Sequence, residues 1–175
     1  MSTAKIKKLK TQIYFTATWL ANVLTVTTSS AHYLVTGDVV SVIPASALDM
    51  TLKGQVTVLS PTEFTISTNQ PYSYLRGLVE VDFFRTGQTG RQIFTLPRST
   101  GTAAVMQSFV TGAGGAAYNF DLSLDGTHWV PAASVTHPLV DGDSDFQTIA
   151  PAWLYASIDI TSIGAATKLE VLYSA

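Results

Sequence analysis

The chain has 175 residues, of which 46% are hydrophobic and 13% are charged. The charged fraction is about half the usual value of roughly 25%. There is no cysteine, which excludes disulfides and thiolate metal sites. Thr, Ser, Ala and Gly replace the missing charge and favour strands and turns over helices. A weakly charged surface tends to associate, so it indicates either contact with other subunits or a domain simply rich in small residues.

Charge is distributed unevenly along the chain, whose net charge is −2. Four lysines fall within the first ten residues, namely Lys5, Lys7, Lys8 and Lys10. We predict that residues 1–10 form a basic N-terminal arm that contacts an acidic partner, the alternative being a solubilising terminus. Nucleic acid is not the expected partner, because aromatic or arginine residues do not alternate with these lysines.

No segment of the sequence has the pattern of a signal peptide or a membrane span. The residues that follow the lysines, 11–16, are too few and too polar for the core of a signal peptide. The apolar runs fall far short of the roughly 20 residues that a membrane helix needs. We therefore expect a protein made in the cytoplasm, without a membrane partner.

The first half alternates apolar and polar residues with period two, which predicts short strands separated by turns. Turn residues occur at Thr36–Asp38 and Ser60–Thr62. Residues 44–52, with Ser46 as N-cap, could form one helical turn. The predicted strands are 23–27, 38–43, 54–59, 63–67 and 79–84. Strands at this spacing favour a small β-barrel over residues 11–85.

The second half shows the same alternation beyond a polar, Gly-containing boundary at 86–90. Asp125-Gly126 is a strong turn signal and should be followed by a strand at 127–130. A closing hairpin is expected from 154–161 and 169–173, around the turn at Gly164. The other predicted strands are 91–96, 106–110 and 117–124. The fold prediction is all-β: the barrel, then a jelly-roll-like antiparallel β-sandwich over 91–175.

One acidic cluster and one glycine-rich segment are candidate sites. Asp141, Asp143 and Asp145 could converge on Ca²⁺, but Phe146 and Ala152 stand where the twelve-residue calcium loop requires Gly and Glu. A solvated acidic turn is therefore favoured over a metal site. Gly112, Gly114 and Gly115 lack the Lys-Ser/Thr of a phosphate-binding loop, and we interpret them as a flexible tip at a contact surface.

The sequence does not indicate a catalytic site or a cofactor. His32, His128 and His137 are not at metal-ligand spacing, and the GxSxG pattern of a serine hydrolase is absent. The many serines permit a Ser–His–Asp triad in principle, but no motif selects its residues. Trp129 and Trp153 are predicted to anchor the core of the second module, with a carbohydrate-stacking platform as the alternative. We therefore expect a protein that is not an enzyme.

Residues 24–42, which include Ala31-His32-Tyr33-Leu34-Val35-Thr36-Gly37-Asp38, resemble a segment of tailed-phage virion proteins. In that segment a strand leads to Ala-His-x-Leu-x-x-Gly-Asp-x-Val, and a Phe-Thr-Ile strand, here Phe64–Ile66, closes a small barrel. His32 and Leu34 should lie beneath the Gly37 turn. The segment Ser123–Trp129 is similar to a hairpin of virion β-sandwiches, and 153–158 to their penultimate strand.

This resemblance implies a virion structural protein, first of all a capsid decoration or cement protein that stabilises the shell through β-module contacts. The expected partners are the major capsid protein or other virion subunits, with a homo-oligomer, such as a trimer, as the assembled form. A neck, tail or fibre-attachment protein is the alternative within the virion. A carbohydrate-binding β-sandwich is the alternative from another class.

Overall fold

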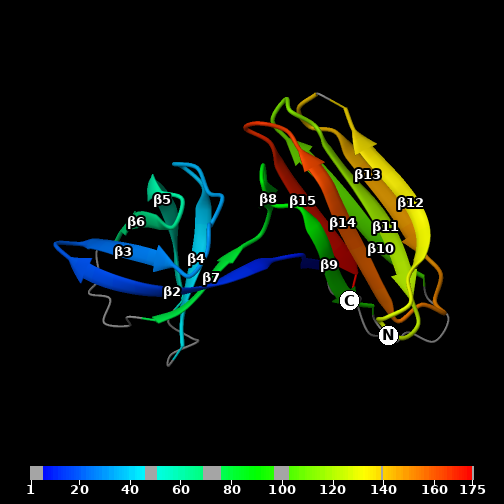
Figure 1. The fold of residues 1–175 in the computed structure, drawn as a ribbon, viewed down its shortest axis with the longest axis horizontal. Coiled ribbons are helices and arrows are strands. Elements are labelled where there is room, and N and C mark those ends of the chain that lie inside the picture. Colours follow the sequence, from blue (N-terminus) through cyan, green and yellow to red (C-terminus); the bar gives the residue numbers. More distant parts are fainter. Residues whose placement is uncertain (1–5, 46–50, 69–75, 97–102, 139, 175) are drawn as a thin grey trace. The chain divides into compact units, whose positions relative to one another are not determined.

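The computed structural model describes residues 6–45, 51–68, 76–96, 103–138 and 140–174. These residues form fifteen strands and no helix, which confirms the all-β class. They divide into two compact units (Figure 1): Lys10–Asp82, and Phe83–Ala175 together with the segment that precedes Lys10. The chain thus begins in one unit, builds the whole of the other, and returns at Phe83.

The Lys10–Asp82 unit is a closed barrel of six antiparallel strands in the order β2-β3-β6-β5-β4-β7, with β7 pairing back to β2. Leu24, Phe64 and Val79 belong to its buried apolar interior. Gly77 is required by close approach, since a Cβ there would lie 2.0 Å from the Ile43 carbonyl oxygen. The strands are β2 (Thr11–Leu20), β3 (Val23–Thr28), β4 (Val39–Pro44), β5 (Leu52–Ser60), β6 (Glu63–Ser67) and β7 (Arg76–Val81).

The second unit is a sandwich of two antiparallel sheets. One sheet has the order β1-β15-β10-β13, with β8 also pairing with β15, and the other has the order β12-β11-β14-β9. The strands are β1 (Ile6–Lys8), β8 (Phe84–Arg85), β9 (Gly90–Thr95), β10 (Ala104–Thr111), β11 (Ala116–Ser123), β12 (Val130–His137), β13 (Ser144–Ile149), β14 (Tyr155–Ile163) and β15 (Lys168–Ser174). Leaving β1 aside, the orders β8-β15-β10-β13 and β9-β14-β11-β12 make an eight-stranded jelly roll, which confirms the predicted fold.

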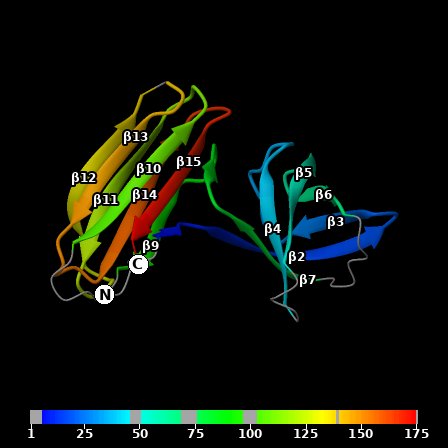
Figure 2. The same cartoon turned by 180° about the vertical axis from the view of Figure 1, so that it is seen from behind.

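The core of the sandwich lies between its two sheets. Met106 and Leu169 enter it from one sheet, and Phe120 and Ile158 from the other. Seen from behind, β13, β10 and β15 run side by side across one sheet (Figure 2). Their second face, opposite the core, is therefore an outer surface of the sandwich.

The N-terminal segment differs from the predicted arm, because it contributes a strand to the sandwich. Ile6, Lys7 and Lys8 form β1 and pair with Ser174, Tyr173 and Leu172 of β15. Leu9 follows, and its N–H donates to the Val171 carbonyl at 2.8 Å. Its side chain is buried in the sandwich core.

Two other expectations are corrected by the strand pairing. The predicted closing hairpin is wrong, because β14 and β15 belong to different sheets and do not pair with each other. Each strand buries one face in the same core, from opposite sides, so alternation alone suggested a hairpin. The strand expected at 127–130 begins only at Val130 and continues through Pro131. Residues 46–50 of the predicted helical turn lie outside the described residues, and its ends belong to β4 and β5.

Candidate functional site

A chain of hydrogen bonds links the two sheets of the sandwich. Ser108 Oγ on β10 lies 2.8 Å from the Tyr118 hydroxyl on β11 and 2.8 Å from His137 Nε2 at the end of β12. His137 Nδ1 lies 2.7 Å from Asp143 Oδ2. Ser108, Tyr118 and His137 are buried. These four residues form the buried network, which has the Ser–His–Asp connectivity that the sequence did not reveal.

The Asp143 carboxylate determines where the protons of the buried network lie. Because Asp143 accepts the Nδ1–H of His137, the Nε2 of a neutral ring accepts the Ser108 hydroxyl proton. Ser108 Oγ in turn accepts the Tyr118 hydroxyl proton. Burial raises the pKa of Tyr118 to about 12, which keeps its phenol protonated as this donor.

The geometry of the buried network fits a structural role. A catalytic serine must be reached by its substrate, but Ser108 is completely buried and its Oγ already has two partners. The four side chains satisfy one another's hydrogen bonds inside the protein, where unpaired polar groups are costly. They therefore tie β10 of one sheet to β11 and β12 of the other.

The three predicted acidic ligands have separate partners. Asp143 belongs to the buried network, Asp141 Oδ1 accepts the Gly112 N–H at 2.6 Å, and Asp145 Oδ2 accepts from Gln147 Nε2 at 2.7 Å. Among the described residues, no group of three His, Cys, Asp or Glu residues is placed to hold a metal ion. The carboxylates act as hydrogen-bond acceptors for the β10–β13 end of the sandwich.

The Gly112–Gly115 segment is a packed turn, unlike the flexible tip that we expected. The Gly114 N–H donates to Thr167 Oγ1 at 2.9 Å, and the Gly115 carbonyl accepts from Gly164 at 2.9 Å. A Cβ on Gly114 would lie 2.4 Å from Thr167 Oγ1. The glycines thus let the β10–β11 turn lie directly against the β14–β15 turn.

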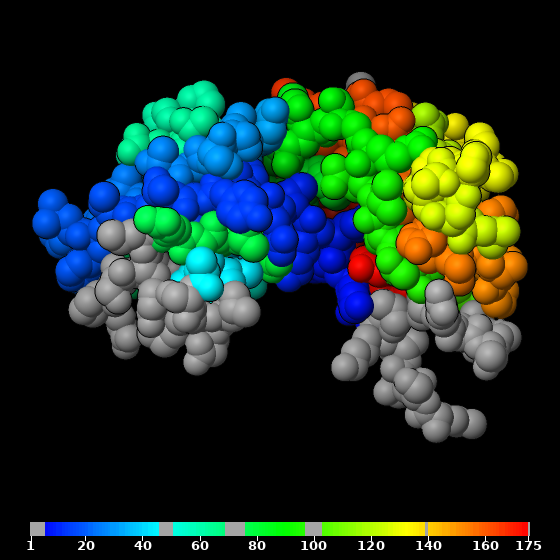
Figure 3. Space-filling view, turned by 60° about the horizontal axis from the view of Figure 1, so that its bottom comes forward, coloured from blue at the N-terminus to red at the C-terminus, as the bar shows by residue number. Residues whose placement is uncertain are grey.

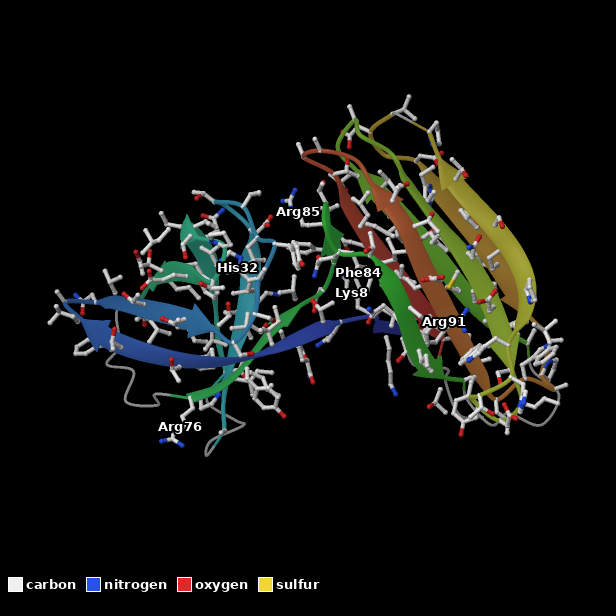
Figure 4. All side chains as sticks on the ribbon, in the orientation of Figure 1. Lys8, His32, Arg76, Phe84, Arg85 and Arg91 are labelled. Carbon is white, nitrogen blue, oxygen red and sulfur yellow. The ribbon has the colours of Figure 1, made fainter. Side chains whose placement is uncertain are left out.

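The basic residues of the N-terminal segment face acidic partners within their own units. Lys8, which is labelled in Figure 4, belongs to β1, and its Nζ lies 2.8 Å from Glu170 Oε2. Lys10 donates to Glu80 and lies 3.8 Å from Asp82. The hydrogen bond to Glu80 raises the pKa of Lys10. Lys7 lies in β1, and Lys5 lies outside the described residues.

In the Ala31–Asp38 loop of the barrel, His32 and Leu34 are buried, as expected for residues that lie beneath the Gly37 turn. His32 Nδ1 accepts the Leu34 N–H at 3.0 Å, and the buried Asp38 accepts the Val35 N–H at 3.0 Å. Figure 4 shows His32 within the barrel unit. Tyr33 has a positive φ of 55°, a strained conformation for a bulky residue. The loop therefore presents Tyr33 and Val35 at the surface, and backbone hydrogen bonds to His32 and Asp38 fix its path.

A polar turn joins β11 to β12, and with β12 it forms the yellow surface of Figure 3. Asp125 Oδ1 accepts the N–H groups of Thr127 and His128, each at 2.8 Å, and its Oδ2 lies 2.6 Å from His128 Nδ1. Trp129 lies beneath the Arg91 guanidinium, which is 5.1 Å from its ring, and is not part of the core it was predicted to anchor. Trp153 does pack against that core.

An apolar groove of about 70 Å³ lies on the sheet that contains β1, β15, β10 and β13. Ile6 and Phe146 on its rim are 75% and 57% exposed. The register places Leu172 opposite Gln107, and Gln107 opposite Phe146, so the groove crosses β15, β10 and β13, and Ile6 extends it onto β1. Its lining consists of Ile6, Val105, Gln107, Phe146, Leu172, Tyr173 and Ser174. We call this surface the apolar groove.

No protein-family model matches the chain, and no curated protein matches it significantly. Among the described residues there is no helix long and apolar enough to cross a membrane.

Proposed function

We propose that this protein is a virion structural protein of a tailed phage, and that it decorates and stabilises the capsid shell through contacts made by its sandwich. The observation that carries the proposal is the apolar groove, where large apolar side chains are exposed on a regular sheet face. Neighbouring exposed apolar side chains on four paired strands favour a protein–protein contact, and this supports the proposal. The jelly roll itself is a fold of viral capsid domains, among others.

The role requires no catalysis and no cofactor. The buried network has the connectivity of a hydrolase triad, but its serine is inaccessible. The Lys8–Glu170 pair lies on β1 and β15, which also contribute Ile6 and Leu172 to the groove, so a polar rim borders an apolar centre. The proposed partner is the major capsid protein or another virion subunit, and the assembled form is a homo-oligomer.

The test uses the full chain and empty shells assembled from the capsid protein of the same phage. Wild-type protein should co-sediment with the shells at a fixed ratio and raise their melting temperature. Ile6→Glu should weaken this binding, because it places a charge in the apolar groove. Leu20→Glu in the barrel, at a residue that is 79% exposed, is the matched control and should bind normally. Wild-type protein that does not bind the shell contradicts the proposal.

A second experiment distinguishes a location on the head from one on the tail. Antibody labelling of whole virions should mark the head if the protein decorates the shell. Label at the neck, tail or fibres instead would favour the alternative within the virion.

A carbohydrate-binding function is the second candidate, and Trp129 is the observation that favours it. The indole is only half-buried, next to the exposed Val130, and jelly rolls also form lectin domains. Trp129→Ala should then abolish binding to a glycan array, whereas Ile6→Glu should not. Wild-type protein that binds no glycan on the array would exclude this candidate.

A further inference from the structure

The sandwich has an open edge at β13. Among the described residues, β13 pairs with one strand only, β10, so its other side offers unpaired backbone groups (Figure 1). Its sequence, Ser-Asp-Phe-Gln-Thr-Ile, lacks the lysines and prolines that protect other edges, such as Lys7 and Lys8 on β1 and Pro131 on β12. Its pairing with β10 has no bulge. Asp145, opposite Ser108 on the face towards the other sheet, is the one charged residue of β13, and the outward-facing Ser144, Phe146 and Thr148 are uncharged, so this edge remains a template for a further strand.

The hydrogen bonds of β10 determine which groups of β13 face outward. The Val110 N–H donates to Asp143 and the Val110 carbonyl accepts from Gly142, so both backbone groups of Val110 point towards β13. Successive residues of a strand point their backbone groups to alternate sides, so Ser108 and Met106 also point towards β13. Val105, of opposite parity, donates its N–H to Ser174 Oγ on the β15 side, which agrees with this alternation.

The register then assigns the free groups. Ser108 and Met106 lie opposite Asp145 and Gln147, which therefore bond to β10. The N–H and C=O groups of the intervening residues, Ser144, Phe146 and Thr148, point away from the sheet.

We propose that β13 pairs with β13 of a second copy of this chain, antiparallel, around a two-fold axis at Phe146. In this register Phe146 lies opposite the same residue of the second copy, and Ser144 lies opposite its Thr148. All three outward-pointing residues then exchange backbone hydrogen bonds. No like charges face each other, because Asp145 lies opposite Gln147.

The side chains fit this contact as well. Phe146 is 57% exposed and lines the apolar groove, so pairing buries the two phenyl rings against each other and joins the two grooves across the axis. The contact is isologous, as most homo-oligomer contacts are. It gives a dimer, whereas a trimer would need another surface. The proposal does not rest on binding to a capsid.

Cysteine cross-linking tests the register, since the chain has no cysteine of its own. Residues in a hydrogen-bonded antiparallel pair have Cα atoms about 5.5 Å apart, within disulfide range. Phe146→Cys should therefore form a disulfide-linked dimer under mild oxidation. Thr148→Cys alone should not, because the two sites would be about 14 Å apart along the strands. Thr148→Cys mixed with Ser144→Cys should cross-link. Failure of Phe146→Cys to cross-link, or equal cross-linking by Thr148→Cys alone, would overturn the proposal.

Opposite charges introduced at Phe146 test the two-fold contact in solution. The molar mass of the full chain is measured by light scattering. The wild type should have twice the 18.7 kDa mass of one chain. Phe146→Lys and Phe146→Glu should each be monomeric, because like charges would meet at the axis, and an equimolar mixture should recover the dimer. Circular dichroism shows whether each variant is folded. A wild-type monomer, or an oligomer that both folded variants leave intact, would refute the two-fold contact.

Discussion

Ser108 connects more of the sandwich than its size suggests, because its single oxygen serves both Tyr118 and His137. Removal of this hydroxyl leaves two buried polar atoms, the Tyr118 hydroxyl and His137 Nε2, without this partner. Loss of one such partner commonly costs about 1–3 kcal/mol. The stability of this region therefore depends on a residue without large apolar surface.

Ser108→Ala should lower the free energy of unfolding by roughly 1–3 kcal/mol, and Tyr118→Phe by about 1 kcal/mol, since Tyr118→Phe leaves the Ser108–His137 bond in place. Urea denaturation of the sandwich measures both. Ser134→Ala is the control, because its hydroxyl forms only an exposed bond to Asn119. A Ser108→Ala protein as stable as the control would show that the buried network is not formed.

Asp125 and His128 form an exposed ion pair whose titration can be predicted. The hydrogen bonds that His128 donates lower the pKa of Asp125, and the side-chain bond to Asp125 raises the pKa of His128 above its ordinary 6.5. The His128 contribution is present below pH 6.5 and is lost as pH rises through the raised pKa. The Asp125 contribution is present above pH 3.8 and is lost as pH falls through the lowered pKa. Both contributions are therefore fully present between pH 3.8 and pH 6.5, where the ion pair stabilises the turn most.

In an NMR titration, His128 should titrate above 6.5 in the native protein and close to 6.5 in Asp125→Asn. The asparagine oxygen can still accept the backbone N–H groups, so the turn itself should persist. A His128 pKa at or below 6.5 in the wild type would contradict the ion pair.

At the scale of elements, alternation located the strands that bury one clean face. Residues 63–67 were predicted as a strand and form β6, because Phe64 and Ile66 point inward and their neighbours outward. The strand β2 was missed, since Tyr14 and Leu20 add exposed apolar residues to its outer side. For β13, the acidic residues at 141–145 suggested a turn.

Pairing could be predicted less well than strand location. Period two specifies which face of a strand is buried but not which sheet it joins, so it predicts a hairpin for β14 and β15 although they lie in different sheets. The buried network could not be predicted from the sequence for the same reason. It joins residue 108 to residue 137 through the packing of two sheets, and no local spacing encodes that contact.

The strand β1 should contribute stability to the sandwich beyond its three residues. Leu9, directly after β1, is buried in the sandwich core and bonded to Val171. Leu9→Ala should lower the free energy of unfolding of the sandwich by about 2–5 kcal/mol. Thermal or urea unfolding followed by near-ultraviolet circular dichroism measures this loss. Ile6→Ala, at an exposed position, should cost much less, and equal costs would indicate that this segment does not pack as described.

At the scale of the whole molecule, the barrel is an insertion in the sandwich. It occupies Lys10–Asp82, between β1 and β8, and both flanking strands pair with β15. Its six strands close on one another, so it contains its own core. The sandwich, in contrast, is discontinuous in sequence.

Separate fragments should behave accordingly. Residues 10–82 alone should unfold cooperatively, because the closed barrel leaves no unpaired sheet edge. Residues 83–175 alone should be less stable than the sandwich of the full chain, and a peptide of residues 1–9 should restore stability by mass action. Heat-capacity calorimetry of each fragment is the measurement. A fragment 83–175 as stable as the intact sandwich would show that β1 and Leu9 contribute little.

The insertion also has a consequence for proteolysis. Lys10 and Asp82, the first and last residues of the barrel, are an ion pair at 3.8 Å, so the barrel's entry and exit lie together. The polypeptide joins barrel and sandwich twice, at 9–10 and at 82–83. A cut at 9–10 leaves the barrel covalently joined to the sandwich at 82–83, whereas after a cut at 82–83 only the non-covalent pairing of β1 with β15 and the packing of Leu9 hold the two modules together. The two links therefore differ in consequence: cleavage at 82–83 can separate the modules, and cleavage at 9–10 cannot.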